Sequence, residues 1–394
     1  MRPEEALSAG WTATVHERIA AIAAADWNAC AGDASPYVRH EHLRALEESG
    51  VAAPQTGLAP RHVVLRDGSG GIVAAAPTWL KAHSNGELGV DLGLAMAHAR
   101  AIGPYYPKLQ VEVPMTPIAG PRLLVRPGID ESAARAALLS ALRDEAGRCG
   151  ASSLQIAYMA PPDAQAAAAF GMTASEGNAY VWRALGATSF DALLRQMRSK
   201  PRSMIQGERR RVASYGLAYR VVSGAELDAA WAERFHALYT TTFARRGQDA
   251  WLNADYFRRL FRDLSDAVEL LGAFEGAKCV GALLCVRGRS TLYGQHWGQA
   301  GDRALLHFEL ACYRAIERAI ELGVDSLDLG TTGLHKASRG FGIEATHHAA
   351  WFRAPAFRDI AVAGLARKRA AAATEREAET ARLPFAAGPA GAPT

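Results

Sequence analysis

A repeated order of secondary-structure signals limits the folds open to this chain more than any other feature of its sequence. From Arg61 the sequence reads as strand, turn and strand, "HVVLRD", "GSGG" and "IVAAAPTWLK", followed by "HSNGELGVDLGL". From Leu270 the same order returns as "LLGAF", "EGAK", "CVGALLCVRG" and "STLYGQHWG". Helical periodicity follows in each half, over residues 130–148 and 302–322, and a short apolar strand comes next, "SSLQIAYM" or "DSLDLGT".

This repeat predicts an α/β (α+β) protein built from two copies of one β-β-β-α-β domain. Each copy should hold a mixed, mainly antiparallel sheet flanked by helices. Chance similarity between short apolar segments is the alternative. At 394 residues the chain is also too long for one ordinary core. We expect a helical N-terminal segment (1–60), a first half (61–187), a basic helical connector (188–217), a second half (218–363), and a tail (364–394) that is helical and then disordered.

Charge and cysteine content argue against several classes of protein. The 44 Lys and Arg residues against 40 Asp and Glu residues leave a net charge of +4, which is too small to indicate DNA binding. No stretch approaches the ~18 uninterrupted apolar residues of a membrane span, and the N-terminus lacks the pattern of a secretory signal. The five cysteines are scattered without CxxC spacing, so we expect a cytoplasmic protein without disulfides. His40 and His42 point apart on a predicted helix, and we predict no metal site.

The helix predicted over residues 302–322 carries a carboxylate on its apolar face. Asp302 is suited to be its N-cap. Apolar residues recur at spacings of three to four and form one stripe, made by Leu305, Phe308, Cys312, Ile316 and Ile320. Glu309 falls within this stripe. A carboxylate in such a position is costly unless it is paired, so Glu309 is either a structural ion pair or an acid or base of a functional site.

The connector "DALLRQMRSKPRSMIQGERRRVASYG" is strongly basic. Pro201 favours the start of a helix that ends near Tyr215. Arg202 and Arg209 are seven residues apart and share one face of it, and Lys200 precedes them, which is a suitable arrangement for phosphate near a helix N-terminus. A solvated helix face is the alternative. The sequence lacks GxxxxGK[ST], a strand-linked GxGxxG and GxSxG, which argues against an NTPase, a dinucleotide enzyme and a serine hydrolase.

Two stretches of the first half combine hydrogen-bonding side chains with rigid backbone. "GPYYPKLQVEVPMTPIAG" contains four prolines together with Tyr105, Tyr106, Lys108 and Glu112. Prolines restrict the unfolded chain, and a rigid loop rich in polar side chains is typical of a binding wall, although a structural arm is the alternative. In "WLKAHSNGELGVD" the polar residues cluster around a turn at strand ends; they are Lys81, His83, Glu87 and Asp91.

The second half has a comparable stretch directly after its last short strand. "GLHKASRGF" places Lys336 and Arg339 between glycines. A solvated loop is one interpretation of this pattern. We favour a loop that faces a substrate and binds an anion.

Several of these stretches, taken in order, resemble one known family. "WLKAHSNGELGVD", "YYPKLQVEVPMTPIAGPRLL", "LYGQHWG", "LHFELACY" and "GLHKASRGF" are similar to motifs of the FemAB-like "peptidoglycan biosynthesis/recognition" family, over about residues 43–357. The resemblance implies two acetyltransferase-like (GNAT-type) halves. It also implies transfer of an acyl group to a primary amine, because Fem enzymes transfer aminoacyl groups from tRNA to peptidoglycan-precursor peptides and GNAT enzymes transfer acyl groups from coenzyme A.

The resemblance also implies roles for particular residues. It places Tyr293 and His296 of "LYGQHWG" at the substrate, and Lys336 and Arg339 at a phosphate or carboxylate, with Lys336 also near the donor phosphates. His335 joins the catalytic candidates.

The sequence departs from the family pattern in three places. Leu334 replaces the glutamate of the family's "GEHK", and Tyr180 replaces the histidine of "QFHW". The GNAT pyrophosphate signature is absent before the second-half helix, which favours the Fem side of the group over use of acetyl-CoA.

From these observations we expect an N-acyltransferase. Its co-substrate would be an acyl-CoA or an aminoacyl-tRNA, without a bound cofactor, and its acceptor the amine of a small molecule or peptide. With the second type of donor, tRNA would be a partner. The expected base is Asp91 or Glu309, with His83, His296 and His335 as the next candidates. A peptide- or precursor-binding protein on a degenerate acyltransferase scaffold is the alternative.

Overall fold

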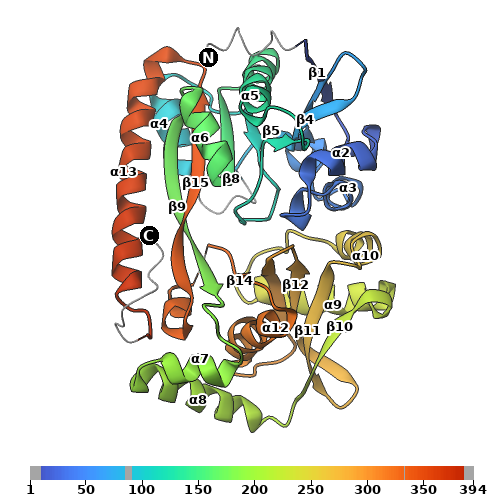
Figure 1. Ribbon diagram of the computed structural model, residues 1–394, viewed down its shortest axis with the longest axis vertical. Helices are drawn as coiled ribbons and strands as arrows, with labels where there is room; N and C mark the ends of the chain where they lie inside the picture. The colour runs from blue at the N-terminus through green and yellow to red at the C-terminus, as the bar shows by residue number, and fades with distance from the viewer. Residues whose placement is uncertain (1–9, 85–90, 332, 386–394) are drawn as a thin grey trace. The chain divides into compact units, whose positions relative to one another are not determined.

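The chain forms two compact units in a computed structural model that describes residues 10–84, 91–331 and 333–385 (Figure 1). Unit 1 comprises Met1–Gly177 and Ala345–Ala373, and unit 2 comprises Asn178–Glu344 and Thr374–Thr394. Two long strands, β9 (Thr173–Arg183) and β15 (Gly342–Phe352), and the helix α13 (Pro355–Thr380) contribute residues to both units. No described helix is both long and apolar enough to cross a membrane.

Unit 1 contains two groups of strands. The first group is antiparallel, in the order β1 (Thr12–His16), β3 (His62–Arg66), β4 (Ile72–Ala76) and β7 (Leu124–Val125). The second runs in the order β15, β8 (Ser153–Met159), β6 (Lys108–Val111), β5 (Thr78–Lys81) and β2 (Leu58–Pro60). Of the strand pairs that the structure describes in it, β6–β8 is parallel and the others are antiparallel. The stretch "IVAAAPTWLK" therefore forms two strands in different groups, because Pro77 separates them and lacks the N–H of a ladder residue.

Helices cover the apolar faces of these strands. They are α2 (Ala24–Ala31), α3 (His40–Glu48), α4 (Leu92–Ala101), α5 (Glu131–Arg148), α6 (Pro161–Ala169) and the first part of α13, with short 3₁₀ turns η2 (Ile19–Ala21), η3 (Pro36–Val38) and η4 (Pro54–Thr56). Helix α5 begins where the sequence predicts, because Asp130 accepts hydrogen bonds from the Ser132 and Ala133 N–H groups. The N-terminal segment, expected to be helical, also contributes β1.

Unit 2 is built on one mainly antiparallel group of strands. The order is β10 (Ala218–Ser223), β11 (Val268–Glu275), β12 (Lys278–Arg287), β13 (Thr291–Gln299), β14 (Ser326–Asp328) and the end of β9. Among the described strands of this group, the β13–β14 pair is parallel and the other pairs are antiparallel. In both units, then, a helix leads into a short strand that pairs in parallel with an earlier one, β6 with β8 and β13 with β14. The predicted fold class, α/β with mixed and mainly antiparallel sheets flanked by helices, is confirmed.

The helices of unit 2 are α7 (Phe190–Gln196), α8 (Ser199–Ala213), α9 (Ala229–Ala244), α10 (Ala254–Asp263), α11 (Leu306–Phe308) and α12 (Ala315–Leu322). Between α11 and α12 lies a π-helix, η6 (Glu309–Arg314), and two 3₁₀ turns are η5 (Gly224–Glu226) and η7 (Leu334–Arg339). Helix α9 approaches β13 so closely that a β-carbon on Gly298 would lie 1.9 Å from the Leu238 carbonyl oxygen. Glycine is therefore required at that point of the strand.

The helix predicted over residues 302–322 differs from the expectation at its start. It begins at Leu306 rather than after Asp302, because Leu305 adopts a left-handed conformation with φ 67°. The π-helix that follows adds a residue to one turn, which shifts the buried face. Leu306 and Leu310 are fully buried, whereas the predicted stripe residues Leu305 and Phe308 are partly exposed. The predicted stripe packs against the core, and in its first turn Leu306 and Leu310 are buried more deeply than Leu305 and Phe308.

Candidate functional site

The last residue of β14 is a buried carboxylate. Asp328 is 5% exposed and lies opposite Tyr293 of β13 and Val181 of β9. The β13–β14 ladder ends at this pair, whereas β13 continues to Gln299. The Gly330 N–H donates to Asp328 Oδ1 at 2.7 Å. Burial raises the pKa of Asp328 to about 6, although the Gly330 hydrogen bond and the Lys336 charge act in the opposite direction. The carboxyl end of a parallel strand is a common ligand position in α/β sheets.

Lys336 binds the residue that follows this aspartate. Its Nζ donates to the Leu329 carbonyl oxygen at 2.6 Å and lies 5.6 Å from the centre of the Tyr180 ring. Burial lowers the pKa of Lys336 to about 8, even though Cys312 and Asp328 act to raise it. An ammonium has three donors, and within the described residues one hydrogen bond from Nζ is found. Lys336 therefore retains N–H donors for a ligand.

The perturbations of Asp328 and Lys336 are complementary. Burial moves the carboxyl pKa up to about 6 and the ammonium pKa down to about 8, so both groups are mainly ionised near pH 7 and both titrate close to it. Opposed shifts of this kind mark acid and base pairs in functional sites. The sequence predicts Lys336 and misses Asp328. The available signal was an aspartate in the apolar strand "DSLDLGT".

Two imidazoles lie beside this pair. Burial, and then the Arg339 and Lys336 charges, lower the pKa of His335 to about 4. Burial and the His335 and Lys336 charges lower the pKa of His307 to about 3. The His307 ring lies 4.4 Å from that of Trp297 and 5.9 Å from that of His335. Among the described residues His335 Nε2 has no hydrogen-bond partner. Both rings are neutral at pH 7.

Gly333 shapes the loop that carries His335 and Lys336. Its φ is 115°, which is favourable only for glycine. A β-carbon there would lie 2.8 Å from His335 Cε1 and 3.2 Å from Lys336 Cε. The loop itself is η7, in which Lys336, Ala337 and Arg339 are buried. The solvated-loop alternative for this stretch is therefore wrong.

Arg339 anchors η7 to its neighbours. Its Nη2 pairs with Glu208 Oε1 of α8 at 2.6 Å, and its Nη1 donates to the His335 carbonyl oxygen at 2.7 Å. Its Nε donates to the Tyr313 hydroxyl at 3.0 Å, and the Tyr313 hydroxyl donates to Glu208 Oε2. The guanidinium also lies 3.8 Å from the centre of the Phe308 ring. The Arg339 charge is thus balanced within the protein, and its role in holding a substrate anion stays a prediction. Glu208 and Tyr313 had no signal in the sequence.

Glu309 is buried, as expected, and paired. Its Oε1 accepts from Arg209 Nη2 at 3.1 Å and from Arg314 Nε at 2.9 Å. Arg209 Nη1 also donates to Glu317 Oε1 at 2.7 Å. These contacts join α8, the π-helix and α12 in one ion-pair network. They support the interpretation of Glu309 as a member of a structural ion pair. A role as base stays a prediction.

The predicted phosphate-binding residues lie in different surroundings. Lys200 and Arg202 are in the first turn of α8, and neither has an ion-pair partner among the described residues. Arg209 is in the middle of that helix and is paired with two glutamates. No contact within the described residues joins these three side chains to Lys336. Lys200 and Arg202 therefore remain the available cations of this set.

The first-half candidates form a buried polar cluster in unit 1. Asp91 Oδ2 accepts from Lys108 Nζ at 2.5 Å and from the Tyr105 hydroxyl at 2.9 Å, and its Oδ1 accepts from the Ser84 hydroxyl at 2.6 Å. Burial acts to raise the pKa of Asp91, but the Lys108 charge and these hydrogen bonds hold it below its usual value. The Ser84 hydroxyl also contacts that of Tyr106 at 2.7 Å.

A second ion pair lies on the same strands. Lys81 Nζ donates to Glu112 Oε1 at 2.6 Å, and Gln110 Nε2 donates to Glu112 Oε2 at 2.9 Å. Lys81 and Lys108 are opposite each other across β5 and β6, and both are almost fully buried. Cations this deeply buried are rare unless they are paired. Within the part of the chain that the structure describes, Glu112 pairs with Lys81 and Asp91 pairs with Lys108, so each lysine charge of the cluster is balanced by a carboxylate.

The remaining candidates are placed outside these clusters. His83 packs against Gly57, where a β-carbon would lie 2.4 Å from its Nε2. His296 packs edge-on against the ring of Tyr239 at 5.4 Å. Glu87 lies outside the described residues. No group of His, Cys, Asp and Glu side chains suited to a metal ion occurs within the described residues.

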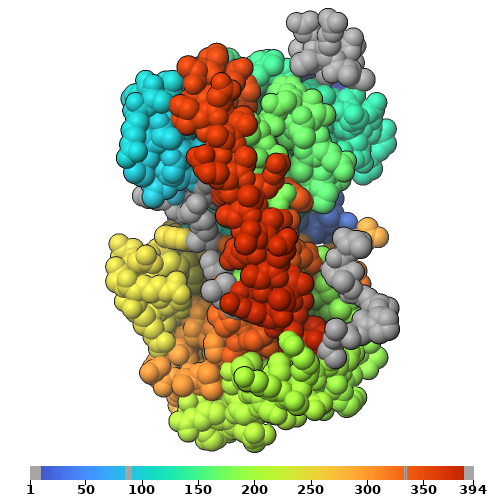
Figure 2. Space-filling model, turned by 90° about the vertical axis from the view of Figure 1, so that its left-hand side faces the viewer, coloured from blue at the N-terminus to red at the C-terminus, as the bar shows by residue number. Residues whose placement is uncertain are grey.

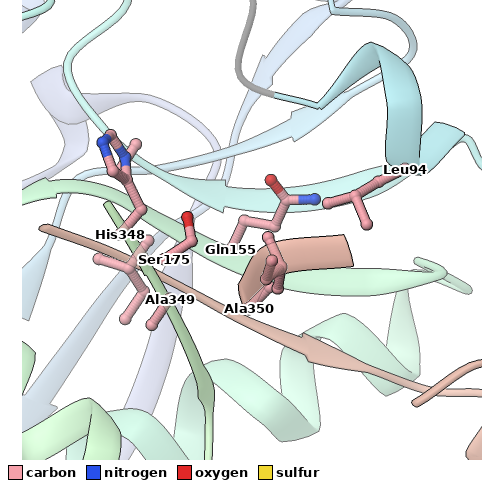
Figure 3. A pocket seen from close by; sticks show the side chains of 9 residues that line it. Leu94, Gln155, Ser175, His348, Ala349 and Ala350 are labelled. Carbon is pink, nitrogen blue, oxygen red and sulfur yellow. The ribbon is translucent and has the colours of Figure 1, made fainter. Parts of the chain in front are cut away.

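A small cavity lies beside the unit 1 cluster. Figure 3 shows Gln155, Ser175 and His348 at its edge, together with Leu94, Ala349 and Ala350. It has room for about one water molecule, which excludes it as a substrate site. Burial lowers the pKa of His348 to about 3, so this imidazole is neutral. Its Nδ1 accepts from the Tyr158 N–H at 3.3 Å, and its Nε2 contacts the Thr346 hydroxyl at 2.9 Å.

Known structures share the fold at low sequence identity. The C-terminal DUF2156 domain assigned to a lysylphosphatidylglycerol synthetase of Agrobacterium fabrum is 13% identical, with 86% of this chain and 94% of that chain covered and a TM-score of 0.53. FemX is 14% identical, with 80% and 93% covered and a TM-score of 0.50. At such identities the likeness extends to the fold alone.

The family comparison covers nearly the whole chain. No curated protein matches the sequence. The model of the FemAB-like family, described as peptidoglycan biosynthesis/recognition, matches residues 18–387. The motifs around Asp91, Lys108 and Lys336 all lie within that range. The chain therefore belongs to the FemAB-like family.

Proposed function

We propose that this protein is an N-acyltransferase that moves an acyl or aminoacyl group from an activated donor to a primary amine. The observation that carries the proposal is the buried Asp328 carboxylate at the end of β14 together with buried Lys336 of η7, whose Nζ donates to the neighbouring Leu329 carbonyl oxygen. Membership of a family described by peptidoglycan biosynthesis supports a peptidoglycan precursor or small peptide as the acceptor. An acyl-CoA or an aminoacyl-tRNA in the cytoplasm would be the donor.

The chemistry requires two functions that this pair can supply. The acceptor nitrogen attacks the donor carbonyl, and the carbonyl oxygen becomes an oxyanion. The free N–H donors of Lys336 would stabilise that oxyanion. The attacking nitrogen must lose a proton, and Asp328 would accept it because no cation lies within ion-pair distance of this carboxylate among the described residues. The C–N bond forms as the C–S or C–O bond of the donor breaks, and the proton passes to the leaving group.

Asp328 is a stronger candidate base than the carboxylates predicted from the sequence. Asp91 accepts from Lys108, Tyr105 and Ser84, and Glu309 is held by two arginines. Neutral His335, with its free Nε2, would contact the substrate or assist the proton transfer. Lys200 and Arg202 would attract the phosphates of the donor.

Product analysis by mass spectrometry tests this proposal. Purified protein is incubated with acyl-CoAs or charged tRNA and with candidate amines, and acylated products are measured. We expect turnover by the wild type and a loss of at least about 10²-fold in Lys336→Met. Lys278→Met is the matched control, because Lys278 is an exposed lysine of the same unit. Equal turnover in wild type and Lys336→Met would refute the assignment.

The second candidate function is peptide or precursor binding without catalysis. The ion pairs of the two carboxylates predicted from the sequence favour this candidate. Asp91 is paired with Lys108 and Glu309 with two arginines, so neither is free to act as a base. Saturable binding of a peptidoglycan-precursor peptide without any product in the same assay would support this alternative and contradict the enzyme.

A further inference from the structure

Exposed apolar side chains lie on α4, directly after it and on α13 in unit 1. Leu92 is 68% exposed, Met96 50% and Ile102 44%, and Ile360 on α13 is 44% exposed. These four are half of the eight large hydrophobic side chains that are exposed in the described part of the chain. Leu92 and Met96 are four residues apart and share one face of the helix. Apolar side chains gathered in this way mark an interaction surface more often than scattered ones.

The opposite face of α4 is already used within the unit. Ala95 and His98 are buried there, and the His98 ring lies 4.8 Å from that of Phe357 on α13. Figure 2 shows α4, in cyan, beside the first half of α13, in orange-red, at the surface. Leu94 also faces α13, since its Cδ2 would lie 3.8 Å from a β-carbon on Gly364. The exposed residues Leu92 and Met96 are therefore not needed for the packing of α4.

Unpaired positive charge accompanies this surface. Arg100 follows Met96 by four residues on the exposed face of α4, and Arg367 follows Ile360 by seven residues on α13. Neither guanidinium has an ion-pair or hydrogen-bond partner among the described residues. The stretch 355–373 holds four basic residues and one acidic residue, Asp359. Helix α4 itself has no acidic residue.

We propose that α4, with Ile360 and Arg367 of α13, docks unit 1 onto the surface of an anionic lipid bilayer. An interfacial helix buries its apolar side chains at the boundary between head groups and acyl chains, while arginines beside it contact anionic head groups. The combination of exposed Leu92, Met96 and Ile102 with unpaired Arg100 and Arg367 fits such a surface. This inference is independent of the proposed reaction.

Vesicle co-sedimentation of the full chain tests the proposal. We expect the wild type to bind vesicles of mixed phosphatidylcholine and phosphatidylglycerol, and to bind phosphatidylcholine vesicles more weakly. Leu92→Ser with Met96→Ser should lower binding by about tenfold, because the apolar contribution is lost. Arg100→Gln with Arg367→Gln should lower binding to the mixed vesicles by about fivefold and leave binding to phosphatidylcholine unchanged. Added salt should reproduce the second effect.

Leu185→Ser is the matched control, because Leu185 is 65% exposed in unit 2 and should be neutral. Thermal melts establish that each variant is folded. The proposal is wrong if the wild type binds neither kind of vesicle, or if the α4 variants bind as the wild type does. It is also wrong if sedimentation velocity finds a dimer that Leu92→Ser with Met96→Ser converts to a monomer, since a second copy then occupies this face.

Discussion

Replacing Asp328 with asparagine separates a functional carboxylate from a structural one. The folded protein moves the pKa of Asp328 from 3.8 to about 6, a shift worth ~3 kcal/mol at about 1.36 kcal/mol per unit. Because this pKa is raised, the stabilising contribution of Asp328 is fully present below pH 3.8 and is lost as the pH rises through about 6. At pH 7 the ionised carboxylate therefore lowers the free energy of unfolding.

Asparagine keeps the shape of the side chain and carries no charge. Its Oδ1 can still accept from the Gly330 N–H. We therefore expect Asp328→Asn to be as stable as the wild type or more stable at pH 7, and to lose that advantage near pH 4. Acyl transfer by the same variant should fall by at least about 10²-fold, the usual effect of removing a general base.

The assay combines thermal melts at the two pH values with measurement of product by mass spectrometry. Asp325→Asn is the matched control, because Asp325 is exposed just before β14 and should change neither quantity. A large fall in melting temperature for Asp328→Asn would make this carboxylate structural. Full activity in a folded Asp328→Asn variant would refute its role as the base.

Three further substitutions test other parts of the site. Lys336→Met should lower turnover by at least about 10²-fold without loss of melting temperature at pH 7. The folded protein lowers the pKa of Lys336 from 10.5 to about 8, so the stability that this lysine contributes is present above pH 10.5 and is lost as the pH falls through about 8. A strongly destabilised Lys336→Met would contradict this. Gly333→Ala should reduce turnover by about tenfold or more, because its β-carbon would collide with His335 and Lys336; unchanged kinetics would show that the loop adapts. Glu309→Gln should lower the free energy of unfolding by roughly 1–3 kcal/mol, since Arg209 and Arg314 lose a partner, and leave most of the activity of the folded protein. A stable but inactive Glu309→Gln would restore Glu309 as the base.

Local patterns in the sequence predict much of the fold. The "GSGG" turn between two apolar runs predicts the β3–β4 pair, and Asp130 predicts the start of α5. The second long helix was misplaced because the left-handed Leu305 and the π-helix have no signature in the hydrophobic pattern. Strand pairing across Pro77 was missed because it depends on which neighbouring strand each segment meets in the folded chain.

The candidate site could be predicted only in part, because burial and pairing in the folded chain decide which of its residues are perturbed or available. Lys336 stands out because a lysine between glycines after a buried strand is unusual. Asp328 does not stand out, because burial raises its pKa and the sequence of β14 does not show how deeply this residue is buried. The sequence predicted that Arg339 is free to bind an anion. In the structure its charge is balanced by Glu208, which lies 131 residues earlier in the chain. Long-range ion pairs of this kind decide which charged residues remain available to a ligand.

The pH dependence of acyl transfer tests the central claim most directly. If Asp328 must be ionised and Lys336 protonated, kcat/KM should rise through a pKa of about 6 and fall through a pKa of about 8. The rate should then be about tenfold lower at about pH 5 and pH 9 than at its maximum near pH 7. Asp328→Asn should lose the acidic limb, and both limbs should stay in place when the acceptor is exchanged for an amine of different basicity. A profile that is flat between pH 5 and pH 9, or limbs that move with the pKa of the acceptor, would contradict the assignment of this pair as the catalytic groups.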